Sequence, residues 1–150
     1  MKKQVYFANG EKILPTGNHN MKLESPKVTA DKSQQEMFQF LTKVENYEQI
    51  MPDSKEKFKV ISEDSFLFQL KGMPEIRLKI IETTEPDLVV LGSTAEKFPF
   101  RLKTHIAEAG ENKSEVNMDF EGEFNAMMSM MIKSPLKKFI TALTENIGKL

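Results

Sequence analysis

Residues 125–150 read NAMMSMMIKSPLKKFITALTENIGKL, and their apolar residues recur at the three- and four-residue spacing of a helix. The apolar stripe consists of Met128, Met131, Ile132, Leu136, Phe139, Ile140, Leu143 and Ile147. Most charged residues of the segment lie off this stripe, which predicts an amphipathic helix that needs an apolar surface to cover it. Pro135 leaves two interpretations open: one long helix kinked at the proline, or a second helix that begins there with Ser134 as its cap.

The preceding residues 55–121 change to the two-residue period of strands. In one strand, for example, Phe66, Phe68 and Leu70 share one face. About six such strands are separated by short polar turns, so we expect an antiparallel meander with one apolar and one polar face. The helix after Pro135 would be about 22 Å long, close to the roughly 23 Å of a seven-residue strand. It would therefore cover the apolar face of the sheet.

Two short helices are expected upstream of this meander. Ser33 and Glu36 form the capping-box pattern that begins a helix, because each side chain is placed to bond the backbone of the other residue. A second short helix is predicted over residues 46–51, where Pro52 ends it.

The first strand and the start of the domain are predicted from the remaining N-terminal residues. Residues 21–29 have the pattern of a strand, and Pro26 confines that strand to an edge or a bulge. Residues 1–20 have the glycine, proline and asparagine content of a loop-like leader. We therefore expect one domain over residues 21–150.

Composition bears on several classes of function. The net charge of -1 gives no basic surplus for nucleic acid or an anionic membrane, and Lys133, Lys137 and Lys138 are interpreted as a solvated helix face. The absence of cysteine excludes disulfides, thiolate metal sites and cysteine nucleophiles. No apolar run approaches the roughly 18 residues of a membrane span, and no signal peptide is recognisable, so we expect a cytoplasmic protein without membrane insertion.

The order of these elements resembles the helix-grip fold of the START/Bet v 1-like (SRPBCC) superfamily, which includes polyketide cyclase-like proteins. Residues 32–52, ending in NYEQIMP, resemble the opening helices of the family. The methionine-rich residues 125–131, followed by PLKKF at 135–139, resemble the start of the last helix in uncharacterised bacterial members. The resemblance covers residues 21–150, but the glycine-rich loop of plant members is missing.

The resemblance implies an α+β fold, in which a curved antiparallel sheet of about seven strands wraps around a long C-terminal helix. It also implies an apolar small molecule or lipid between the sheet and that helix. The residues expected to line this cavity are Phe66, Phe68, Leu70, Ile76, Leu78, Phe98, Phe100, Leu102, Thr104, Met118, Phe120, Met128, Met131, Leu136 and Phe139. A bent sheet leaves space beneath a helix, and apolar walls favour an apolar guest. The alternative is that the same side chains fill this space at normal core density.

Four methionines within residues 127–131 cannot all face the same side of a helix. Met128 and Met131 fit the apolar stripe, as residues of the core or of a pocket lid. Met127 or Met130 is therefore a candidate for exposure and for contact with a partner, because methionine adapts to varied surfaces.

Few polar residues are candidates for chemistry. Thr104 lies on the apolar side of its strand and would offer its hydroxyl either to a ligand or to the backbone. His105 alternates onto the polar face, as does Arg101 unless a bulge shifts it into the cavity. We recognise no catalytic residue, no set of metal ligands and no cofactor motif.

Three functions remain open at this point. The first is a binding or carrier protein for an apolar small molecule or lipid, and the second is a cyclase- or hydrolase-type enzyme of the same superfamily. The enzyme is disfavoured because no base or nucleophile is recognisable. The third is a protein-interaction module that needs no ligand.

Overall fold

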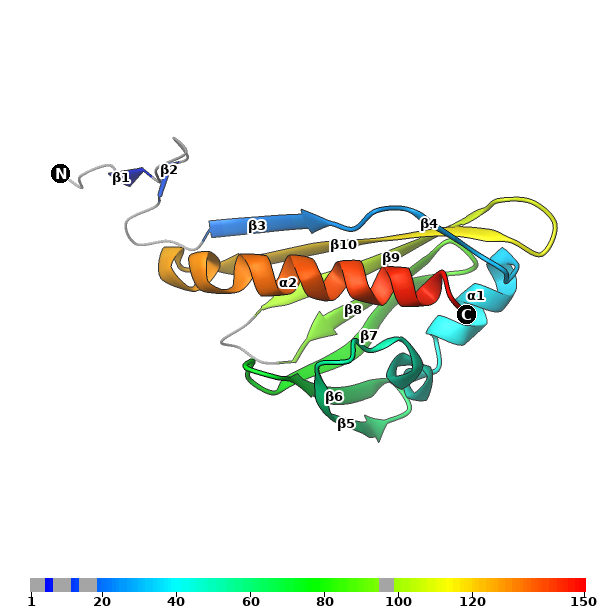
Figure 1. The fold of residues 1–150 in the computed structure, drawn as a ribbon, viewed down its shortest axis with the longest axis horizontal. Coiled ribbons are helices and arrows are strands. Elements are labelled where there is room, and N and C mark those ends of the chain that lie inside the picture. The colour runs from blue at the N-terminus through cyan, green and yellow to red at the C-terminus, as the bar shows by residue number, and fades with distance from the viewer. Residues whose placement is uncertain (1–4, 7–11, 14–18, 95–98) are drawn as a thin grey trace.

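The computed structural model describes residues 5–6, 12–13, 19–94 and 99–150 (Figure 1). The helices are α1 (Gln34–Leu41), the 3₁₀-helix η1 (Val44–Ile50) and α2 (Ala126–Ile147). The strands are β1 (Val5–Tyr6), β2 (Lys12–Ile13), β3 (His19–Glu24), β4 (Val28–Ala30), β5 (Lys55–Ser62), β6 (Ser65–Leu70), β7 (Ile76–Thr84), β8 (Leu88–Ser93), β9 (Phe100–Glu108) and β10 (Ser114–Phe124).

The main sheet is antiparallel and follows the predicted meander. Its strand order is β3-β10-β9-β8-β7-β6-β5, and β4 also pairs with β10. Register shifts interrupt the β5–β6 and β7–β8 pairs, and irregularities of this kind bend a sheet. The curved sheet and the long helix that crosses it confirm the predicted α+β helix-grip fold (Figure 1).

The predicted first strand is split in two at Pro26. Ser25 leaves the strand path there, and its N–H donates to the carbonyl of Met118 at 2.9 Å while its Oγ accepts from the Met118 N–H at 2.8 Å. Because proline has no N–H to donate, the ladder resumes only at Val28. At the other end, β3 begins at His19, so the last residues of the predicted leader belong to the strand.

The capping box that begins α1 is confirmed. The Ser33 Oγ accepts from the Glu36 N–H at 3.1 Å, and the Ser33 N–H donates to Glu36 Oε1 at 3.3 Å. Hydrogen bonding to the exposed Glu36 carboxyl, from the Ser33 side chain first and from the Ser33 backbone N–H second, holds its pKa below the usual value, because both favour the charged form. The second predicted helix is η1, which begins two residues earlier than expected.

Removal of the Ser33 cap is expected to lower the stability of the fold modestly. We expect Ser33→Ala to lower the free energy of unfolding by about 1 kcal/mol, since it leaves the Glu36 N–H without its acceptor. Urea denaturation measures the loss, and Ser54→Ala is the control because Ser54 is an exposed turn residue. Equal stability of the two variants would show that the cap contributes nothing to the fold.

The helix α2 is continuous through Pro135, so the single long helix is the correct one of the two interpretations. Its second half is held by the sheet and by η1. Phe139 stacks on Phe68 of β6 with ring centroids 5.0 Å apart, and the Asn146 side-chain amide donates to the carbonyl of Ile50 at 2.9 Å. The helices α1 and η1 thus lie at the C-terminal end of α2, whereas its first turns lie at the opposite end of the sheet (Figure 1).

Candidate functional site

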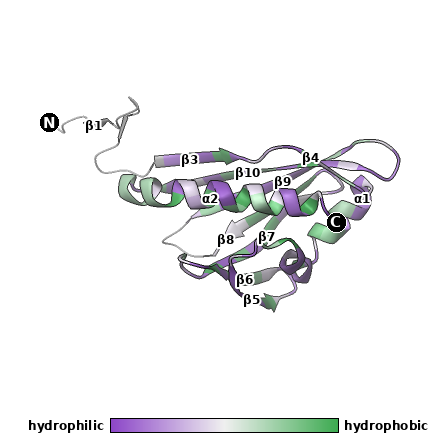
Figure 2. Cartoon of the chain, viewed as in Figure 1, coloured by the Kyte–Doolittle hydropathy of each residue, from purple (hydrophilic) through white to green (hydrophobic). Residues whose placement is uncertain are grey.

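A pocket of about 290 Å³ lies between the sheet and the first three turns of α2. Its walls come from the β6–β7 turn, the start of β7, the adjoining ends of β8, β9 and β10, and α2. The apolar lining residues are Met73, Pro74, Ile76, Phe100, Phe124, Met128, Met131, Ile132, Pro135 and Leu136. Figure 2 shows the first turns of α2 in the green of hydrophobic residues, at the end of the helix that faces this pocket.

One glycine makes room for the aromatic wall of the pocket. A Cβ at Gly122 would lie 2.7 Å from Phe124 Cε2 and 2.8 Å from Phe100 Cβ, distances that real side chains essentially never show. The Phe100 ring packs on Phe120 with centroids 4.9 Å apart. The missing side chain of Gly122 therefore lets Phe100 and Phe124 lie side by side and face the pocket.

The rim of the pocket is charged. Glu75 accepts a hydrogen bond from the Lys57 Nζ at 3.0 Å, and an Arg77 Nη2 lies 3.7 Å from the same carboxylate. The hydrogen bond from Lys57 is the main cause that holds the pKa of Glu75 below its usual value. The pocket thus has an apolar interior and a polar rim on which the carboxylate of Glu75 is ionised at neutral pH.

Solved structures with the same architecture identify the fold. A truncated norcoclaurine synthase from Thalictrum flavum matches with a TM-score of 0.68 at 12% identity, over 91% of this chain and 96% of that chain. A START superfamily protein from Mycobacterium smegmatis matches with a TM-score of 0.62 at 12% identity, over 87% and 98% of the two chains. XoxI from Bacillus cereus gives 0.65 at 7% identity, over 87% and 93%. The chain has the START/Bet v 1-like fold.

Sequence comparison adds no family or activity to this likeness. No protein-family model matches the chain, and no curated protein matches it in sequence. At such low identity the solved structures establish the START/Bet v 1-like fold alone.

The predicted lining residues other than Phe98 and Thr104 divide into two groups. Ile76, Phe100, Met128, Met131 and Leu136 line the pocket. A second set is buried in the hydrophobic core, where Phe139 of α2 stacks on Phe68 of β6: Phe66, Phe68, Leu70, Leu78, Leu102, Met118, Phe120 and Phe139. Phe98 lies outside the described residues. The sheet–helix interface is therefore packed along its middle, and it is open at the start of the helix.

Sequence reasoning missed several pocket residues. Met73 and Pro74 belong to a segment that reads only as a break between strands, and Ile132 was assigned to the helix stripe without a role in the pocket. Phe124 is the missed residue that the sequence could have indicated, because it continues the alternation of Met118 and Phe120. The intervening Gly122 marks a place where neighbouring side chains crowd the strand.

Thr104 is fully buried on the inner face of β9, between Val89 and Met118 of the neighbouring strands. Its Oγ1 has no hydrogen-bond partner among the described residues, so it bonds neither to the backbone nor to a side chain there. A buried hydroxyl without a partner lowers the stability of the fold.

Replacing this hydroxyl by a methyl group is expected to stabilise the protein. Thr104→Val keeps the shape of the side chain and removes the unsatisfied oxygen, so the free energy of unfolding should rise by about 1 kcal/mol. Thr144→Val is the matched control, because the equally buried Thr144 Oγ1 donates to the Ile140 carbonyl at 2.8 Å. That change should destabilise the fold, and a loss of stability in both variants would show that Thr104 has a partner.

The methionines of α2 are more exposed than the helix stripe predicts. Met127, Met130 and Met131 are 73%, 70% and 67% exposed, whereas Met128 is partly buried against the core. Met131 was expected on the buried stripe. It remains exposed because the first turns of α2 lie over the open pocket, where no filled core covers them.

The two candidates on the polar face of the sheet, His105 and Arg101, both lie outside the lining of the pocket. His105 lies on that face as expected, and its Nε2 is 2.6 Å from the Asp119 Oδ2. Arg101 is exposed on the same face, opposite Glu121 of β10, and does not enter the pocket. Among the described residues, no group of three His, Cys, Asp or Glu side chains is placed to hold a metal ion.

Proposed function

We propose that the chain binds an apolar small molecule, or the apolar part of a lipid, in the pocket beneath the first turns of α2, as a binding or carrier protein. The observation that supports this most strongly is the composition of the walls, which are apolar apart from Gly72, Glu75, Arg77 and Ser93. Apolar walls bind water weakly. An apolar ligand that displaces this water from the pocket is therefore favoured.

The size of the pocket limits the ligand. A volume of about 290 Å³ is at the small end of the roughly 300–1,000 Å³ of ligand pockets. It suits a ring system or a segment of an acyl chain, and a longer molecule would extend past the rim. There Glu75 and Arg77 would contact the polar part of an amphipathic ligand.

Another protein with the same fold has been solved with aromatic small molecules bound. Norcoclaurine synthase from Thalictrum flavum has been solved in complex with dopamine and hydroxybenzaldehyde, with a TM-score of 0.66 at 11% identity to this chain. This precedent supports a small-molecule pocket as a use of the fold. It assigns neither that activity nor those ligands to this chain.

A carrier is favoured over an enzyme by the chemistry of the rim. A general base needs a pKa close to the working pH, whereas the hydrogen bond from Lys57 lowers the pKa of Glu75. The guanidinium of Arg77 supplies hydrogen-bond donors and no acceptor, so it is suited to hold an anionic or polar group. Within the described lining, the charged residues are therefore suited to hold a polar group.

Two aspartate variants on neighbouring positions test the pocket. Met128 lines the pocket, whereas Met127 is exposed and lies outside it. Both positions lie in the first turn of α2, where a carboxylate is equally favourable to the helix dipole. We expect Met128→Asp to weaken binding of the neutral dye N-phenylnaphthylamine at least about tenfold, because a charge enters an apolar wall.

The control variant Met127→Asp should keep the dye affinity of the wild type. Fluorescence titration measures both, and circular dichroism confirms that both variants are folded. Failure of the wild-type protein to bind the dye, or equal affinities of the two variants, would contradict the proposed pocket.

A further inference from the structure

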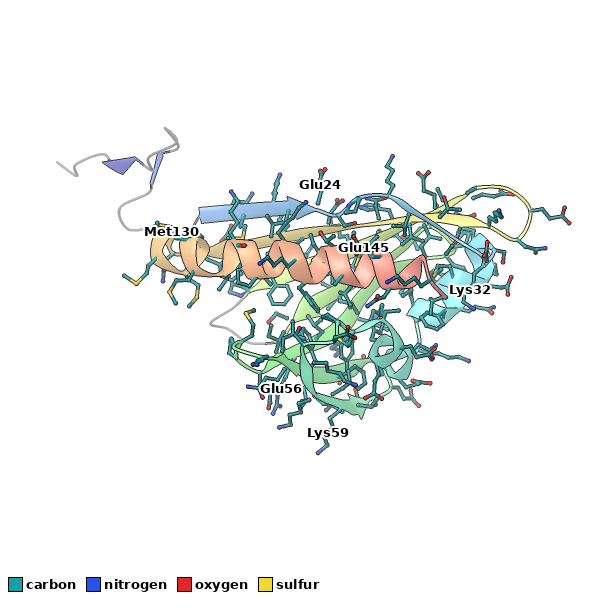
Figure 3. All side chains as sticks on the ribbon, in the orientation of Figure 1. Glu24, Lys32, Glu56, Lys59, Met130 and Glu145 are labelled. Carbon is teal, nitrogen blue, oxygen red and sulfur yellow. The ribbon has the colours of Figure 1, made fainter. Side chains whose placement is uncertain are left out.

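The exposed methionines continue into a basic surface along the same side of α2. Met130 borders a groove of about 820 Å³ between α2 and β3. The groove is also lined by Lys22, Leu23, Glu24, Lys133, Ser134, Lys137 and Lys138. Four lysines thus face one carboxylate there. Figure 3 shows Met130 at the start of α2 and Glu24 on β3 beside the helix.

In the described part of the chain these lysines are not held in ion pairs, although Lys22 lies opposite Glu121 in the register of β3 and β10. Among the described residues, none of Lys22, Lys133, Lys137 and Lys138 forms an ion pair. The Lys137 Nζ donates to the backbone carbonyl of Glu24, which leaves its charge uncompensated. By contrast, Lys55 and Lys57 at the opposite side of the sheet each lie 3.0 Å from a glutamate.

We infer that this part of the molecule docks on the surface of an anionic membrane. We call it the α2 tip surface, and it consists of Met127, Met130, Lys22, Lys133, Lys137 and Lys138. The two methionines would enter the boundary between headgroups and acyl chains, and the lysines would contact the headgroups. The inference stands whether or not the pocket holds a ligand.

The spacing along α2 fits such a boundary. The helix rise places Lys133 about 4.5 Å and Lys138 about 12 Å beyond Met130 along the axis. Apolar residues at the tip followed by cations over this distance match a shallow insertion of about 5–10 Å below headgroup level. No described helix is long and apolar enough to cross a membrane, so the contact would be made at its surface.

A membrane fits this surface better than a protein does. Protein interfaces are depleted of lysine at their core, because each lysine must be desolvated and held in one rotamer. An anionic leaflet attracts lysines that remain hydrated and mobile, and it accepts flexible methionine side chains without a matching pocket. The surface also adjoins the pocket, since Met131 lines the pocket one residue beyond Met130.

Vesicle sedimentation tests the inference. The full chain is mixed with equimolar phosphatidylglycerol–phosphatidylcholine vesicles, or with phosphatidylcholine alone, at low and high salt. We expect binding to the anionic vesicles only, and release by about 0.5 M salt, because the Debye length falls from about 10 Å at 0.1 M towards about 3 Å at 1 M. Absence of binding to anionic vesicles, or equal binding to neutral ones, would overturn the inference.

Two variants locate the contact on α2. The triple change Lys133→Gln, Lys137→Gln, Lys138→Gln and the double change Met127→Ser, Met130→Ser should each weaken vesicle binding at least about tenfold. The matched charge control is Lys59→Gln, Lys71→Gln, Lys113→Gln, three exposed lysines elsewhere that lower the net charge equally. Figure 3 places Lys59 on the side of the molecule away from Met130.

The control variants distinguish a local contact on α2 from a general effect of net charge. The control triple variant should bind vesicles like the wild type, and a loss equal to that of the α2 variant would reduce the effect to net charge and overturn the inference. An unchanged affinity of the double methionine variant would overturn it too. Dye binding to the pocket should persist in all three variants, because none of the changed residues lines it, so failure of the docking surface and failure of the proposed pocket are separable.

Discussion

Replacing Phe68 by alanine is expected to lower the free energy of unfolding by about 3–5 kcal/mol. Phe68 is completely buried on β6, where its ring lies 5.0 Å from Phe139 of α2 and 6.2 Å from Phe66. Its removal leaves a cavity where the sheet holds the helix, and a rigid core closes such a cavity only in part. The loss would be a large fraction of the roughly 5–15 kcal/mol that stabilises a domain.

Urea denaturation measures this loss against a control on the neighbouring strand. Ile61 of β5 is 46% exposed, so Ile61→Ala should cost less than about 1 kcal/mol. A double-mutant cycle with Phe139→Ala then isolates the contact between the two rings, which we expect to be worth about 0.5–1.5 kcal/mol. A coupling of zero would mean that α2 is not packed on the sheet through these residues.

Replacing Gly122 by valine is expected both to destabilise the fold and to abolish dye binding. Valine suits a strand better than glycine by about 1 kcal/mol, which favours the substitution. The clash acts against it: Phe100 Cβ is attached directly to the β9 backbone and cannot swing away as a ring edge can. Because overpacking costs about 1–3 kcal/mol and displaces both aromatic walls, we expect a net loss of stability and a closed pocket.

Glu121→Val separates the crowding from the effect of valine on a strand. Glu121 is exposed on the outer face of β10, one residue before Gly122 and opposite Arg101 of β9. The control should therefore change stability by no more than about 0.5 kcal/mol and should leave dye binding intact. Equal stability and equal dye affinity in the two variants would contradict the role given to Gly122.

Much of the fold was predictable because its signals are local. The Ser33–Glu36 capping box, the alternation within β9 and β10 and the helical spacing after residue 125 all act over a few residues, and the structure confirms them. Alternation fails in β5, where Val60 was expected on the apolar face and is 43% exposed. The split of the first strand at Pro26 was predictable only as an edge or a bulge. The structure shows an edge position, since β3 and β4 pair only with β10 among the described strands, and the two bonds between Ser25 and Met118 join residues far apart in the sequence.

The position of the pocket was less predictable than the face that lines it. Phe68 and Ile76 pair across β6 and β7 on the same face, and alternation identifies both as inward. However, Phe68 stacks on Phe139 of α2, whereas Ile76 lines open space. This difference depends on which turn of the helix lies above each residue, and strand alternation does not contain that information.

The central claim is that an apolar molecule occupies the space beneath the first turns of α2. Methyl NMR of the protein labelled with ¹³C-methyl methionine tests it directly, since methionines occur both at the pocket and in the core. On titration with N-phenylnaphthylamine, we predict ring-current shifts for Met73, Met128 and Met131, which line the pocket, and none for the buried Met37 and Met118. Shifts confined to Met37 and Met118, or no methionine shift at a saturating dye concentration, would contradict the claim.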